Sequence, residues 1–328
     1  MSIFLGHLEL DPPVILAPMS GVTDAPFRRV VSDLGAGLVV SEMIASQAMI
    51  RQTRDSLKRA RGEAEDHPLC VQLAGCEPEV MAEAARLCTD LGAAVIDINF
   101  GCPVKKVVNK AAGAALMRDL AGAAKILSAT VRAVEVPVTL KMRTGWDETE
   151  RNAPELARIA EDCGIRMITV HGRTRCQLYH GHADWAFVRR VKAAVGIPVV
   201  VNGDIRELGD VSRALALSGA DGVMIGRGAT GRPWFLRQVM HFLETGAHLP
   251  APPRAEQRAI VLRHYEAMLS THGVTRGVRM ARKHLAWYSK GFPHGAQFRS
   301  EINRLDDPER VKAAIGALYA PQPARAAA

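Results

Sequence analysis

From residue 14 to about residue 243 the chain alternates short apolar runs with amphipathic segments. The apolar runs are rich in β-branched side chains and are bounded by turn residues, which predicts buried strands. The amphipathic segments between them have helical spacing, and several end at a glycine, as helices commonly do. The expected strands are 14–19, 38–43, 69–74, 95–100, 138–142, 167–171, 199–202 and 222–225.

Eight strand–helix units in about 240 residues are the number and size typical of a (β/α)₈ TIM barrel. A doubly wound open sheet is the alternative, but no Gly-x-Gly-x-x-Gly follows the first strand. The sequence therefore predicts an α/β barrel over residues 1–243, in which the ends of all eight strands meet at one face.

The composition changes after the predicted barrel. Residues 244–254 are rich in proline and glycine and are expected to form a linker. Residues 255–319 predict a small all-α domain with helices at 255–272, 276–290 and 308–319, and residues 320–328 predict a disordered tail.

Net charge is distributed unevenly between these parts. The 328 residues carry a net charge of +8, of which residues 1–243 contribute +2 and residues 244–328 contribute +6. The helix expected at 276–290 places Arg279, Arg282 and Lys283 near Trp287 and Tyr288. A solvated basic face is the simpler interpretation of that helix alone, but together with the segment charge it favours a surface that contacts nucleic-acid phosphates.

Several other classes of protein are disfavoured. No uncharged apolar run reaches the roughly 18 residues of a membrane helix, and the amino terminus has no basic region of the kind that begins a secretory signal. The six cysteines have no Cys-x-x-Cys spacing, so neither a disulfide framework nor a metal site is expected. We expect a cytoplasmic protein without a membrane partner.

Polar residues gather where the predicted strands end. Cys102 follows the strand at 95–100 in the sequence Asn-Phe-Gly-Cys-Pro, and Lys105, Lys106 and Lys110 come soon after it. So many polar groups at one barrel face are costly to bury unless they bind a ligand or one another. The glycine-rich loops at 202–204 and 226–231 favour a phosphate-bearing cofactor, because such barrel loops hold phosphates on backbone N–H groups.

Longer motifs carry a resemblance to a known family. They are Leu16-Ala-Pro-Met-Ser-Gly-Val-Thr-Asp, Asn99-Phe-Gly-Cys-Pro-Val-Lys-Lys, Lys141-Met-Arg-Thr-Gly-Trp, His171-Gly-Arg-Thr-Arg, Asn202-Gly-Asp-Ile and Arg279-Met-Ala-Arg-Lys-His-Leu-Ala-Trp-Tyr. Through these motifs the chain resembles the tRNA-dihydrouridine synthases, and among them the bacterial B-type branch. The resemblance covers nearly the whole chain. The Asn-x-Gly-Cys-Pro motif is specific, whereas the Asn-Gly-Asp and Gly-Arg pieces are shared with other FMN barrels.

The resemblance implies a flavoenzyme that reduces the C5=C6 bond of uridine in tRNA, with a D-loop target expected at position 17. NADPH would reduce bound FMN, and hydride would then pass to uracil C6. Cys102 would be the general acid that protonates C5, a role that suits a thiol because it is mostly protonated at neutral pH.

Site residues follow from the same resemblance. The FMN contacts would be Pro18, Met19, Gln72, Lys141, His171, Asn202, Asp204 through its backbone, Gly226 and Arg227. The contacts to uridine or to tRNA would be Asn99, Lys105, Lys106, Arg173, Arg279, Arg282 and Lys283. No metal and no obligate protein partner are expected, and the family resemblance favours a monomer.

Two other functions remain open from the sequence. An FMN barrel could reduce a free pyrimidine or another small molecule, as dihydroorotate dehydrogenases do, but the basic carboxyl-terminal region argues against this. A regulatory RNA-binding protein could retain an inactive barrel, but Cys102, Lys141 and His171 in one barrel mouth argue against that.

Overall fold

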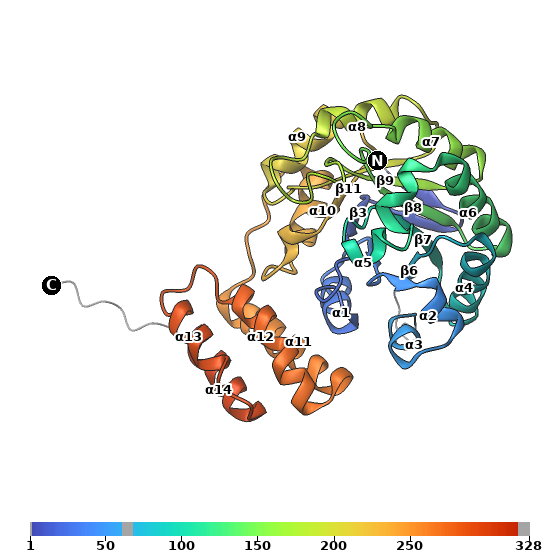
Figure 1. Ribbon diagram of the computed structural model, residues 1–328. Coiled ribbons are helices and arrows are strands. Elements are labelled where there is room, and N and C mark those ends of the chain that lie inside the picture. The colour runs from blue at the N-terminus through green and yellow to red at the C-terminus, as the bar shows by residue number, and fades with distance from the viewer. Residues whose placement is uncertain (1, 61–67, 321–328) are drawn as a thin grey trace. The chain divides into compact units, whose positions relative to one another are not determined.

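Eight parallel strands form a closed barrel in the computed structural model, which describes residues 2–60 and 68–320 (Figure 1). The strands follow the order of the chain around the barrel, and β4 pairs with β6 to close it. The barrel strands are β3 (Val14–Leu16), β4 (Leu38–Val40), β6 (Leu69–Ala74), β7 (Val95–Phe100), β8 (Val138–Arg143), β9 (Met167–His171), β10 (Val199–Asn202) and β11 (Gly222–Ile225). The (β/α)₈ barrel predicted from the sequence is confirmed, and the open sheet is excluded.

Helices cover the outside of the barrel, as Figure 1 shows for α4, α6, α7 and α8. Asp24 and Asp184 cap α1 and α8 by accepting hydrogen bonds from the backbone N–H groups of Phe27 and Phe187. The helices of this part are α1 (Ala25–Asp33), α2 (Ser46–Ile50), α3 (Arg54–Ala60), α4 (Pro78–Asp90), α5 (Lys105–Val108), α6 (Leu120–Ala133), α7 (Ala153–Asp162), α8 (Trp185–Lys192), α9 (Leu208–Ser218) and α10 (Phe235–Thr245).

The first two strands end earlier than the sequence predicts. β3 stops at Leu16, although Ala17 still donates to the carbonyl of Ile225. Pro18 follows and has no N–H group to donate, so the ladder cannot continue through it. The residues after β3 therefore leave the barrel wall and enter the loop at its mouth.

A short hairpin, β1 (Ile3–Leu5) and β2 (Leu8–Leu10), precedes the barrel and was not predicted. Ile3, Leu5 and Leu10 are almost fully buried in one apolar cluster with residues from the beginnings of the barrel strands, such as Leu38 and Val95. The hairpin therefore closes the amino-terminal end of the barrel and leaves the carboxyl-terminal end for a site.

The chain divides into two compact units. The first comprises Met1–Gly228 and Leu236–Leu249, and the second comprises Ala229–Phe235 and Pro250–Ala328. The expected boundary at residue 243 lies inside α10. The predicted tail lies outside the described residues except for Ala320.

The second unit is helical. Asp307 caps its last helix by accepting hydrogen bonds from the backbone N–H groups of Glu309 and Arg310. Its helices are α11 (Arg254–His272), α12 (Val274–Tyr288), α13 (Gly295–Ile302) and α14 (Pro308–Tyr319). Within the described ranges, no helix is long and apolar enough to cross a membrane.

Candidate active site

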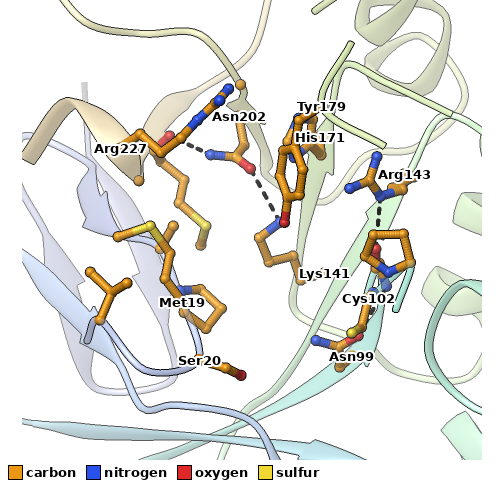
Figure 2. A pocket seen from close by; sticks show the side chains of 18 of the residues that line it. Met19, Ser20, Asn99, Cys102, Lys141, Arg143, His171, Tyr179, Asn202 and Arg227 are labelled. Atoms are coloured by element: carbon orange, nitrogen blue, oxygen red, sulfur yellow. Dashed lines mark hydrogen bonds between the residues drawn. The ribbon is translucent and has the colours of Figure 1, made fainter. Parts of the chain in front are cut away.

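A cavity of about 470 Å³ opens at the carboxyl ends of the barrel strands (Figure 2). Its volume falls within the range of about 300–1,000 Å³ typical of cofactor and ligand sites. Eleven of the predicted site residues line it: Pro18, Met19, Gln72, Asn99, Cys102, Lys141, His171, Asn202, Asp204, Gly226 and Arg227. The alternation of side chains along each strand explains this, because the residues at every second position of β6 to β10 point into the barrel.

Cys102 lies on a turn that Asn99 holds in place. The side-chain oxygen of Asn99 accepts hydrogen bonds from the backbone N–H groups of Gly101 at 3.2 Å and Cys102 at 2.8 Å. The side-chain amide of Asn99 donates to Oε1 of Gln72 at 2.7 Å. Figure 2 shows Asn99 and Cys102 together on one side of the cavity, with Met19 and Ser20 on the other. The half-buried thiol is thus presented to the cavity on a fixed turn.

Lys141 and His171 supply two nitrogen groups with different charges. The ammonium of Lys141 donates to Oδ1 of Asn202 at 3.2 Å. Burial and, to a smaller extent, the charge of Arg143 lower the pKa of Lys141, while Asp97 and Cys102 oppose the change, and the resulting pKa is about 8. Burial, together with the charge of Lys141 and nearby arginines, holds the pKa of His171 well below its usual value. At pH 7 the lysine is therefore mostly charged and the imidazole is neutral.

Asp204 organises the loops after β9 and β10. Its carboxylate accepts from Arg173 at 2.5 Å, from the backbone N–H of Ala183 at 2.8 Å and from Arg227 at 3.1 Å. Burial alone would raise the pKa of Asp204, but the hydrogen bonds from Arg173 and Ala183 together with the charges of Arg173 and Arg227 outweigh it, so the pKa lies below its ordinary value. Asp204 has a φ of 55°, in the left-handed region, directly after Gly203 with a φ of 113°. This sharp turn brings two arginines to one carboxylate.

Arg173 does not reach the cavity. It is almost fully buried, and it donates to the carbonyl groups of His180 and Gly181 as well as to Asp204. Its observed contacts therefore hold the loop at 172–184 against the turn at Asp204.

Arg143 and Tyr179 line the cavity and were not among the predicted site residues. Arg143 donates to the carbonyl groups of Gly101, Thr174 and Leu178, so it joins the Cys102 turn to the loop after β9. Its guanidinium lies 5.6 Å from the ring centroid of the exposed Tyr179. The position of Arg143 at the end of a strand was a usable signal, whereas Tyr179 lies in a loop whose sequence has no periodic pattern.

The remaining predicted residues lie outside the cavity. Lys105 and Lys106 are exposed on α5, which begins three residues after Cys102. Arg279, Arg282 and Lys283 belong to α12 of the helical unit, where Arg282 donates to Asp306 at 2.8 Å and to the carbonyl of Leu305 at 3.1 Å.

The cavity fits a large flat anion such as FMN. Among the described residues that line it, Asp204 is the single acid, whereas Lys141, Arg143, Arg206 and Arg227 supply positive charge. Gly203, Gly226 and Gly228 also line it and leave backbone N–H groups without side chains beside them. A donor set of this kind suits a phosphate together with a ring system that carries hydrogen-bond acceptors.

Comparison with known proteins gives a consistent result. The sequence model of the dihydrouridine synthase (Dus) family matches residues 15–320. A protein of Rickettsia bellii (strain RML369-C) named probable tRNA-dihydrouridine synthase is 56% identical over 318 residues, which cover 97% of this chain and 98% of that protein. The tRNA-dihydrouridine synthase B of Xanthomonas campestris pv. campestris is 54% identical over 305 residues, which cover 93% of this chain and 92% of that protein.

A likeness in fold extends to more distant structures. A morphinone reductase variant in complex with tetrahydroNAD matches with a TM-score of 0.56 and 14% sequence identity, and the match covers 78% of this chain and 92% of that one. This likeness shows the fold alone, whereas the sequence matches cover nearly the whole chain. The chain belongs to the dihydrouridine synthase family.

Proposed function

We propose that this protein reduces the C5=C6 bond of uridine in tRNA to give 5,6-dihydrouridine, with FMN as bound cofactor and NADPH as reductant. The observation that carries the proposal is the meeting of the Cys102 thiol, a charged Lys141 and a neutral His171 around one cavity, in a chain of the dihydrouridine synthase family. When bound, FMN supplies the hydride that adds to C6 of uracil.

The residues of the cavity divide the remaining work. Cys102 donates the proton to C5, and Asn99 contacts the uracil while it holds the turn of the thiol. The ammonium of Lys141 stabilises negative charge on the group that is bound next to it in the cavity. Asn202 positions this ammonium through a hydrogen bond. The cofactor is held by Pro18, Met19, Gln72, Lys141, His171, Asn202, Asp204, Gly226 and Arg227.

Binding of tRNA is assigned to surfaces outside the cavity. A uridine inside folded tRNA must leave its stack to enter a barrel mouth, so the enzyme holds the surrounding RNA largely through backbone and shape. Lys105 and Lys106 and the basic helix with Arg279, Arg282 and Lys283 supply contacts to phosphates. Arg173 acts on the nucleotide through the loop that it fixes.

The expected target is position 17 of the D-loop. The proposal includes a cytoplasmic location, because the tRNA substrate is found in the cytoplasm. It also includes the monomeric state that the family resemblance favours.

The proposal is tested by incubating the purified protein with NADPH and tRNA that lacks dihydrouridine. Mass spectrometry of the nucleosides and of mapped fragments should find one D-loop uridine that has gained two mass units. Cys102→Ala should retain tRNA binding and lose nearly all of this product. A flavin that NADPH bleaches without any product in tRNA would instead favour reduction of a small molecule.

A further inference from the structure

A buried carboxylate lies behind the cavity and takes no part in the chemistry described above. Asp97 is only 2% exposed and points into the barrel from β7. In the sheet it pairs with Gln72 of β6 on one side and with Thr139 of β8 on the other. Oδ2 accepts from Nε2 of Gln72 at 2.7 Å, and Oδ1 accepts from the hydroxyl of Thr139 at 2.6 Å.

These contacts form an unbroken chain from Asp97 to Cys102. The amide of Gln72 joins Asp97 to Asn99, and the amide of Asn99 joins Gln72 to the turn of the thiol. Asn99 and Cys102 at the cavity end of this chain are visible in Figure 2. Gln72, Asn99 and Cys102 line the cavity, whereas Asp97 does not.

The direction of the chain follows from its last members. Backbone N–H groups can only donate, so Asn99 must turn its oxygen towards Cys102 and its nitrogen towards Gln72. Gln72 must then turn its oxygen towards Asn99 and its nitrogen away from it. The group at position 97 must therefore be an acceptor, which a carboxylate supplies.

We infer that Asp97 is a positioning residue that fixes the orientation of the Gln72 and Asn99 amides and thereby holds the Cys102 thiol on its turn. The inference deepens the proposed function, because it rests on the role of Cys102 as the proton donor. Each amide could rotate by half a turn at little steric cost, and the acceptor at the buried end removes that freedom.

Burial of a carboxylate is costly, and the neighbours of Asp97 reduce the cost. Burial raises the pKa of Asp97, while the hydrogen bonds from Thr139 and Gln72 and the charge of Lys141 lower it. Thr139 occupies the oxygen that the chain does not use, so the other oxygen remains available to Gln72. An apolar residue would fill the same space without this cost, but it would leave the Gln72 amide without an acceptor.

The experiment measures the rate at which iodoacetamide alkylates Cys102 in the full-length protein, by peptide-resolved mass spectrometry. The exposed Cys176 serves as an internal reference. Asp97→Leu should raise the Cys102 rate relative to Cys176 by about threefold or more, because a loosened turn exposes the thiol. Asp97→Asn keeps an acceptor towards Gln72 and should stay close to wild type. The matched control is Thr139→Val, which removes the hydrogen bond to the other oxygen and should also leave the rate unchanged.

A double-mutant cycle separates positioning through Gln72 from a general loss of packing. Gln72→Met breaks the chain one step later, so Asp97→Leu should add nothing further in that background. Equal rates in Asp97→Leu and wild type, or effects that multiply in the double variant, would overturn the inference. If Asp97→Leu does not fold, Asp97→Ser replaces it in the same cycle, because the serine side chain is too short for its hydroxyl to reach Gln72.

The activity of the same variants separates this inference from the proposed function. Asp97→Leu should slow formation of dihydrouridine in tRNA and leave reduction of the flavin by NADPH near wild type. If wild type forms no dihydrouridine while the alkylation pattern holds, the proposed function fails and the positioning role stands.

Discussion

At the scale of single residues, Lys141 gives the site its pH dependence. Its pKa of about 8 means that the ammonium of the cofactor-free protein is mostly charged at pH 7 and mostly neutral at pH 9. An anion bound beside it favours the charged form, so binding takes up a proton and affinity falls as pH rises above 8. We expect the affinity for FMN to fall by up to about tenfold per pH unit there, measured by quenching of flavin fluorescence.

Lys141→Arg is the matched control, since a guanidinium remains charged over this range. Its affinity for FMN should stay nearly flat between pH 7 and pH 9, whatever its absolute value. The same decline in both proteins would assign the pH dependence to another group.

The sequence was most informative for site residues that lie at the ends of strands. Gln72, Asn99, Lys141 and Asn202 reach the cavity because barrel topology brings consecutive strand ends to one face. The contacts of Arg173 could not be predicted in this way. Its guanidinium binds Asp204 and two loop carbonyl groups, and these partners are set by how the loop at 172–184 folds back.

At the scale of elements, the turn of Cys102 depends on the short 3₁₀ helix Gly113–Arg118. Gly113 has a φ of 63°, and a Cβ there would lie 2.8 Å from the carbonyl oxygen of Cys102 and 2.9 Å from Val107. Gly113→Ala should therefore lower the free energy of unfolding by about 2–4 kcal/mol, as measured by denaturant unfolding, because backbone strain and a clash add together. Cys102 should also be alkylated faster.

Gly92→Ala isolates the strain from the clash. Gly92 has a φ of 94° and open space around the position of a Cβ. This variant should lose about 1 kcal/mol and leave Cys102 unchanged. Equal losses in the two variants would mean that the approach of Gly113 to Cys102 contributes nothing to stability.

The barrel strands were predictable, whereas the hairpin strands β1 and β2 and helix α13 were not. The six-residue strands β6 and β7 give apolar runs that stand out, and their observed bounds equal the expected ones. The three-residue strands β1 and β2 are too short to form a pattern, and their burial depends on contacts with the far end of the barrel. Helix α13 was missed for a similar reason, because its eight residues include few apolar positions.

At the scale of the whole molecule, the excess of positive charge lies in the last quarter of the chain, with a net charge of +6 in residues 244–328. This part contains most of the helical unit, including α12 with its exposed Arg279. The sequence predicted this asymmetry because charge counts need no structure. It could not predict that residues 229–235 join the helical unit, since that depends on packing between distant segments.

Arg279→Glu tests whether α12 contacts tRNA. The change should weaken tRNA binding by about tenfold at moderate salt, and it should reduce the slope of log affinity against log salt by about 1. Filter binding over a salt series measures both quantities. Arg310→Glu makes the same charge change on the exposed side of α14 in the same unit, so it controls for net charge. Equal weakening by both variants would mean that tRNA responds to the total charge of the helical unit, whereas a selective effect of Arg279→Glu would identify α12 as the contact surface.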